Sequence, residues 1–148
     1  MYDQDLGNPR YLGKKGSGPL EFSAPVGIAA GPSGAIYVCD TGNRRIAVLD
    51  AGGRFERGIP FPGWSGSVEP HVEADSDETL YATDPSANAV LAIAPSGRVE
   101  ARWDADDAGA KFRAPTGVAL DRKDRILYVV NSGDGSISKK RLPERKER

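Results

Sequence analysis

Short apolar segments that end in a polar turn residue recur three times along the chain, at residues 36–40, 80–84 and 127–131. Each is apolar at nearly every position, so both faces of these strands should be buried between neighbouring sheets. Each contains one tyrosine, and these tyrosines lie 44 and 47 residues apart. Self-similarity at such a period predicts the blades of a propeller or the units of a solenoid.

The other elements of the unit recur in the same order. A proline opens each unit, and a turn, the tyrosine strand and a third strand follow. The first two units add a fourth strand at residues 54–58 and 98–103, whereas the third stops before one. Four short antiparallel strands broken by Gly, Pro, Asp and Ser make one blade. The sequence therefore predicts an all-β propeller domain over residues 1–141, with units at about 14–58, 59–103 and 104–141, followed by a charged tail at 142–148.

The first unit resembles the NHL repeat over residues 25–55. The resemblance rests on a proline, a glycine, the tyrosine strand and an Asn-x-Arg-Ile motif, here Pro25, Gly27, Tyr37, Asp40, Asn43, Arg45 and Ile46. The second unit has His71 in place of the glycine, and the third has Asn131 in place of the aspartate. The resemblance implies a ring of six blades, of which this chain supplies half.

A half ring leaves the outer faces of its first and last blades without a neighbour. Residues 9–13 are predicted to form a lone outer strand, which is the element that the third unit lacks. We therefore expect a homodimer with the strand of one copy added to the third blade of the other, which removes an open sheet edge. The segments expected to pair are Arg10, Tyr11, Leu12 and Gly13 with Ser136, Ile137, Ser138 and Lys139. The alternative is that the chain is a fragment of a longer propeller.

Charge is almost balanced overall, at −1, but it is segregated along the chain. Residues 66–107 hold ten acidic and two basic side chains, and the last ten residues hold six basic and two acidic ones. No apolar run is long enough to span a membrane, so no membrane insertion is expected. The N-terminus lacks signal-peptide character, which predicts a cytoplasmic protein for the chain as written. A fragment of a larger bacterial protein is instead compatible with an extracytoplasmic location.

Candidate chemistry is sparse. His71 is the only histidine, and no nucleophile–base pair, metal-ligand cluster or phosphate-binding loop is recognisable, so we predict no catalytic residue, metal or cofactor. The single cysteine, Cys39, is expected to be buried. Asp40, Asp84 and Asn131 end equivalent strands and are expected to accept hydrogen bonds from turn amides.

The loops on one face of the propeller are the remaining candidate for function. In propellers of this type that face usually binds the partner, and the resemblance implies the same here. The candidate partner-binding residues are Lys14, Lys15, Asn43, Arg44, Trp64, His71, Asn88, Lys111 and Asp134. Trp64 lies in a Gly/Pro-rich loop and is the expected anchor.

We interpret the chain as a non-catalytic scaffold or binding module for protein association. One alternative is a ligand-binding or lyase-like enzyme with a channel site near His71 built across two copies. A third is an RNA-binding propeller, which the acidic second unit disfavours because it interrupts any continuous phosphate-binding track.

Overall fold

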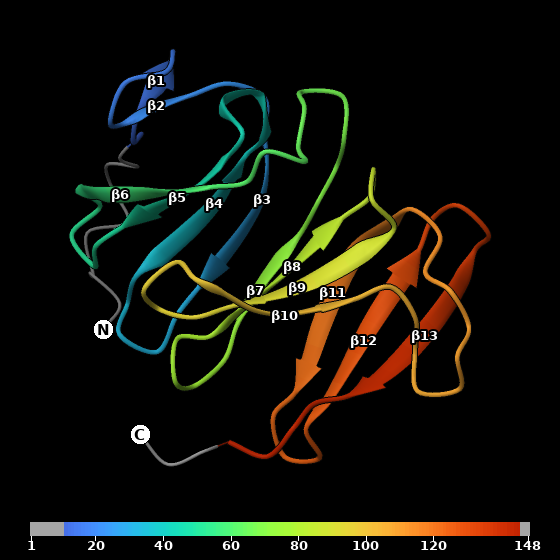
Figure 1. The fold of residues 1–148 in the computed structure, drawn as a ribbon. Helices are drawn as coiled ribbons and strands as arrows, with labels where there is room; N and C mark the ends of the chain where they lie inside the picture. The colour runs from blue at the N-terminus through green and yellow to red at the C-terminus, as the bar shows by residue number, and fades with distance from the viewer. Residues whose placement is uncertain (1–10, 146–148) are drawn as a thin grey trace.

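A computed structural model describes residues 11–145 of the chain, and Figure 1 shows three twisted sheets that follow one another through the molecule. Blade 1 contains β3 (Pro25–Ala30), β4 (Ile36–Asp40), β5 (Arg45–Leu49) and β6 (Phe55–Pro60). Blade 2 contains β7 (Val72–Ala74), β8 (Leu80–Asp84), β9 (Ala89–Ile93) and β10 (Val99–Trp103). Blade 3 contains β11 (Pro115–Asp121), β12 (Ile126–Asn131) and β13 (Ser136–Arg141).

Strand order within each blade follows the chain, and every pair is antiparallel. Blades 1 and 2 have four strands and blade 3 has three. The predicted all-β fold of three successive propeller blades is therefore confirmed. The one helical element among the described residues is the short 3-10 helix η1 (Thr41–Asn43), and none of their helices could cross a membrane.

The segment before blade 1 differs from the prediction of an extended outer strand. Residues 11–13 have no strand pairing, and β1 (Lys14–Lys15) pairs in parallel with β2 (Glu21–Phe22). The Leu12 side chain rests on the turn after β5, where an added Cβ on Gly53 would lie 2.8 Å from Leu12 Cδ1. The predicted pairing of this segment with a second copy stays a prediction. Arg10 lies outside the described residues.

Blade 2 is packed on both faces. Every residue of β8 is buried, with Leu80 and Ala82 in the core shared with blade 1 and Tyr81 in the core shared with blade 3. The prediction of a fully enclosed tyrosine strand is confirmed here. In β12, Leu127 is buried but Val130 is 44% exposed, because no blade of this chain covers the far face of blade 3.

The polar residue at each strand end has the predicted structural role. Asp40 accepts hydrogen bonds from the Ser23 amide at 2.7 Å and from Nε of Arg45 at 2.8 Å. Asp84 accepts from the amide of residue 87, and Asn131 accepts from the amide of residue 113. Each therefore ties its strand to a nearby turn or loop.

Cys39 and Leu142 also belong to the core. Cys39 is fully buried, as predicted, and burial raises the pKa of its thiol to about 12. Leu142 is only 3% exposed and packs between blades 2 and 3. The predicted charged tail therefore begins with a residue of the core.

Candidate functional site

One turn position governs how neighbouring blades meet. The residue three places before each tyrosine has a left-handed backbone, with φ of 85° at Gly34, 66° at Glu78 and 56° at Arg125. Glycine adopts this conformation without strain, whereas a residue with a Cβ pays roughly 1–2 kcal/mol. The backbone strain at Glu78 and Arg125 must therefore be offset by favourable contacts of their side chains.

At the junction of blades 1 and 2, Glu78 reaches back to the preceding blade. Its carboxylate accepts hydrogen bonds from the Tyr37 hydroxyl and from the Ser33 amide, the latter at 2.8 Å. Burial alone would raise the pKa of Glu78, but these hydrogen bonds outweigh it and hold the pKa below its ordinary value. Burial and the hydrogen bond to Glu78 also raise the pKa of Tyr37. The two groups form a closed contact between the blades.

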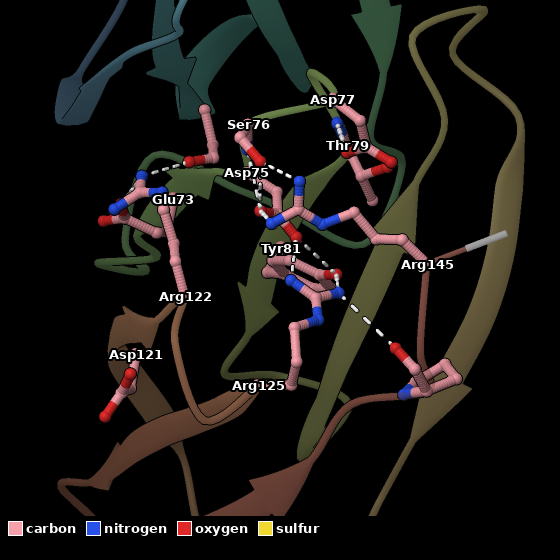
Figure 2. A network of polar contacts seen from close by, with 12 residues as sticks. Glu73, Asp75, Ser76, Asp77, Thr79, Tyr81, Asp121, Arg122, Arg125 and Arg145 are labelled. Atoms are coloured by element: carbon pink, nitrogen blue, oxygen red, sulfur yellow. Dashed lines mark hydrogen bonds and ion pairs between the residues drawn. The ribbon is translucent and has the colours of Figure 1, made fainter. Parts of the chain in front are cut away.

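At the junction of blades 2 and 3, the equivalent residue is a cation and needs a counter-ion. Nη1 of Arg125 lies 2.5 Å from Oδ2 of Asp75, which is buried in the first turn of blade 2 (Figure 2). The Tyr81 hydroxyl donates to the same oxygen at 3.4 Å. A second guanidinium, from Arg145 after β13, lies 3.2 Å from Oδ1 of Asp75 and also contacts the hydroxyl of Ser76.

The two arginines control the titration of Asp75. Burial would raise its pKa, but the hydrogen bonds from Arg125 and the Ser76 amide, with the charges of both arginines, outweigh burial and hold the pKa low. Asp75 is therefore an anion that forms ion pairs with both arginines. Nε of Arg125 is buried without a hydrogen-bond acceptor among the described residues.

A cavity of about 390 Å³ opens beside this network. Tyr81 and Trp103 form its aromatic wall, with ring centroids 6.4 Å apart. The remaining lining residues are Asp77, Thr79, Ala92, Glu100, Ala101, Arg125, Pro143, Glu144 and Arg145. The junction thus joins aromatic surface, carboxylates and guanidinium groups in one place, which is the arrangement of a binding site for a polar ligand.

The predicted anchor Trp64 is not on the surface. It is 1% exposed, it stacks on Phe61 with centroids 4.0 Å apart, and its indole N–H donates to the carbonyl of Thr83. The expectation of an exposed tryptophan is wrong because the loop after β6 folds back into the gap between blades 1 and 2, where the ring completes the core.

The other predicted loop-face residues lie at the same end of the blades, but most are already engaged. Asn43 donates to Gly16 and Asp40, Asn88 accepts from Ala114, Lys111 pairs with Asp104, Lys14 pairs with Glu21, and Asp134 accepts from Ser136. Lys15 and Arg44 are exposed. The loop residues therefore form no compact site comparable with the one between blades 2 and 3.

His71 lies beside the start of the inner strands β3 and β11. It lines a hollow of about 520 Å³ together with Glu69, Thr116 and residues of β3 and β11. No group of three or more His, Cys, Asp or Glu residues that could hold a metal occurs within residues 11–145.

Comparison with known proteins agrees with the architecture. Residues 22–49 match the model of the NHL repeat. Blade 1 is therefore similar to an NHL repeat. The match covers β3 to β5 of blade 1, where Asp40, Asn43 and Arg45 form a hydrogen-bonded corner. No curated protein sequence matches significantly.

Among solved structures, this chain is similar to a catalytically inactive virginiamycin B lyase from Staphylococcus aureus, crystallised with quinupristin. The TM-score is 0.60 at 25% identity, over 83% of this chain and 43% of the lyase. Hydrazine synthase from Kuenenia stuttgartiensis gives a TM-score of 0.57 at 15% identity, over 90% of this chain and 33% of that one. A protein of unknown function from Bacteroides caccae gives 0.58 at 14% identity, over 73% and 39%. The chain spans less than half the length of each.

Sequence reasoning missed the residues of the junction between blades 2 and 3. The available signal was the turn glycine, Gly34, which the second and third units replace with Glu78 and Arg125. A charged residue at a position that favours glycine indicates a specific contact. The contribution of Arg145 could not be anticipated, because no regular pattern places the segment after β13 against blade 2.

Proposed function

We propose that this chain is a protein-association module that binds further propeller blades through its two open blade faces, with a second copy as the partner. The carrying observation is that apolar side chains remain exposed on these faces. On blade 1, Ile28 lies opposite Val38 on the face turned away from blade 2 and is 62% exposed. On blade 3, Ile137 lies opposite Val130 on the corresponding outer face, and they are 69% and 44% exposed.

Burial of these faces would stabilise an assembly. Each large aliphatic side chain that becomes fully buried contributes about 1.5–3 kcal/mol. The outer strand of blade 3, β13, is also an open edge with its next strand missing. Asp107, from the loop that runs beside it in Figure 1, contacts only its last two residues, through the amide of Arg141 at 2.7 Å and Nζ of Lys140 at 3.0 Å.

A partner on the loop face would use the cations that remain exposed there. Lys15, in β1 before blade 1, and Arg44, between β4 and β5, are both exposed. They take the place of Trp64 in this proposal, because the tryptophan is buried. A loop-face partner would therefore carry acidic groups opposite blade 1.

Two variants test the association through the blade faces. Ile28→Asp and Ile137→Asp each place a charge on one outer face and should weaken self-association at least about tenfold, or about 1.4 kcal/mol, in sedimentation equilibrium. Val99→Asp is the matched control, since Val99 is 51% exposed but lies on the outer strand of blade 2. Equal association constants for all three variants and the parent chain would reject the proposed faces.

The structural likeness to virginiamycin B lyase, with the hollow beside His71 and Glu69, favours a ligand-binding or lyase-like protein as the second candidate. In that case a symmetric pair would present two copies of this hollow toward a common channel. Incubation with quinupristin, followed by mass spectrometry, would detect turnover or a bound ligand. Activity that His71→Ala abolishes would support the second candidate, and an unaltered, unbound ligand would reject it.

A further inference from the structure

The guanidinium groups of Arg125 and Arg145 both contact the carboxylate of Asp75 between blades 2 and 3. One guanidinium group is enough to neutralise this carboxylate at the contact between the blades. Arg125, which belongs to blade 3, already neutralises Asp75. Arg145 adds a second positive charge to the same site (Figure 2). The cavity beside them is lined by three further carboxylates, Asp77, Glu100 and Glu144. Without Arg145, the site would hold four carboxylates against two guanidinium groups, that of Arg125 and that of Arg98, which lies 3.8 Å from Glu100, and it would attract a cation.

The two arginines are held in different ways. The Arg125 side chain is 18% exposed, and its backbone carbonyl accepts a hydrogen bond from the Leu142 amide at 2.8 Å. The Arg145 side chain is 36% exposed and belongs to a segment without strand pairing. In the described part of that segment beyond Leu142, the backbone receives one long hydrogen bond, 3.5 Å from Nη2 of Arg125 to the carbonyl of Pro143. Arg145 is thus the exchangeable cation.

The cavity has room and chemistry for more than a single ion. Its volume is about 390 Å³, and its wall includes the rings of Tyr81 and Trp103. Aromatic faces and carboxylates together suit a guanidinium group, which is planar and weakly hydrated and forms directed hydrogen bonds. Leu142, buried at 3% exposure, marks an apolar anchor point three residues before Arg145.

We propose that this groove, defined by Asp75, Tyr81, Glu100, Trp103 and Arg125, is a recognition site for an arginine-bearing peptide, and that Arg145 occupies it as an intramolecular ligand. A peptide from another molecule presents the same chemistry, a guanidinium group on a short basic segment. It must displace Arg145, whose tether gives it an effective concentration in the millimolar range. The segment after β13 therefore sets the threshold for binding. This site is independent of the open blade faces and of the hollow beside His71.

Peptide binding to the full-length Arg145→Ala chain tests the proposal. The probe is a fluorescent peptide with the sequence of residues 142–145, Leu-Pro-Glu-Arg, and its matched control carries citrulline, a neutral isostere, in place of arginine. Fluorescence anisotropy should show binding of the arginine peptide at least about tenfold tighter to Arg145→Ala than to the parent chain, because the intramolecular competitor is gone. The citrulline peptide should not bind. The additional substitution Asp75→Asn should abolish binding. Arg44→Ala alone, which removes an exposed arginine outside this cavity, should resemble the parent chain.

Binding of both peptides alike, or no binding to a folded Arg145→Ala chain, would overturn the proposal and leave Arg145 as a structural ion pair. Circular dichroism melting establishes that each variant is folded. If Arg145→Ala does not fold, the parent chain is titrated to millimolar peptide with Trp103 fluorescence as the readout. A change with the arginine peptide alone supports the site, and no change or an equal change with citrulline rejects it.

Discussion

The two blade junctions of this molecule use the same backbone position in opposite ways. Between blades 1 and 2, the left-handed turn residue is the anion Glu78, which accepts directly from Tyr37. Between blades 2 and 3, it is the cation Arg125, which cannot accept a hydrogen bond and requires the buried Asp75. The first junction is therefore a closed pair, whereas the second is an ion network that can admit another cation. The second junction is the better candidate for ligand binding, because it contains more polar groups than the packing of the two blades requires.

The junctions also differ in how the gap between blades is filled. Trp64 and Phe61 close the first gap with stacked rings. The equivalent loop before blade 3 supplies Phe112, which is buried, but Trp103 stays at the edge of an open cavity. The first junction should therefore dominate stability, and the second should respond more strongly to charge and pH.

The largest expected effect is the loss of the aromatic plug. Trp64→Ala should lower the free energy of unfolding by about 3–5 kcal/mol, because it removes a fully buried ring and leaves a cavity. Trp103→Ala, at the open junction, should cost clearly less. Urea denaturation of the two variants measures the difference, and equal losses would contradict the proposed contrast in packing.

The next largest effect concerns the buried carboxylate. Asp75→Asn leaves Arg125 without its counter-ion and should cost about 3 kcal/mol at neutral pH, since breaking a buried ion pair leaves an uncompensated charge. Glu78→Gln, which leaves a neutral acceptor beside Tyr37, should cost less. The comparison again uses urea denaturation at one salt concentration.

The pH dependence of stability follows from the same carboxylate. The pKa of Asp75 in the folded chain lies below its ordinary value of 3.8, so its contribution is present above that value and is lost as the pH falls through it toward the folded pKa. From about pH 5 to about pH 3, the parent chain should therefore lose more stability than Asp75→Asn. Parallel stability curves for the two chains would show that Asp75 is not held as an anion.

A smaller effect separates the two tyrosine hydroxyls. Tyr37→Phe removes a short hydrogen bond to a carboxylate and should cost about 1.5 kcal/mol or more. Tyr81→Phe removes contacts of 3.4 and 3.5 Å and should cost less than about 1 kcal/mol. Thermal unfolding resolves the order, and a larger loss for Tyr81→Phe would reverse the assignment of the closed pair to the first junction.

The fold could be predicted from the sequence more completely than the candidate site. The tyrosine repeat, the proline at the start of each unit and the turn glycines predicted the blades correctly, because these local signals coincide with the strand ends. The site depended on contacts between units. The burial of Trp64 and the approach of Arg145 to Asp75 are set by how loops fold across a junction, and strand periodicity carries no information about that.

The proposed association joins the open faces of blades 1 and 3 to the open blade faces of a second copy. The mass of the protein in solution tests this association most directly. Multi-angle light scattering of the parent chain at several concentrations should approach about 31 kDa, twice the 15.7 kDa of one chain. The dimer fraction should rise with concentration, and Ile137→Asp should shift it toward the monomer because Ile137 lies on the outer face of blade 3. A mass of 15.7 kDa that stays constant across the concentration series, with the apolar faces still open, would contradict the account.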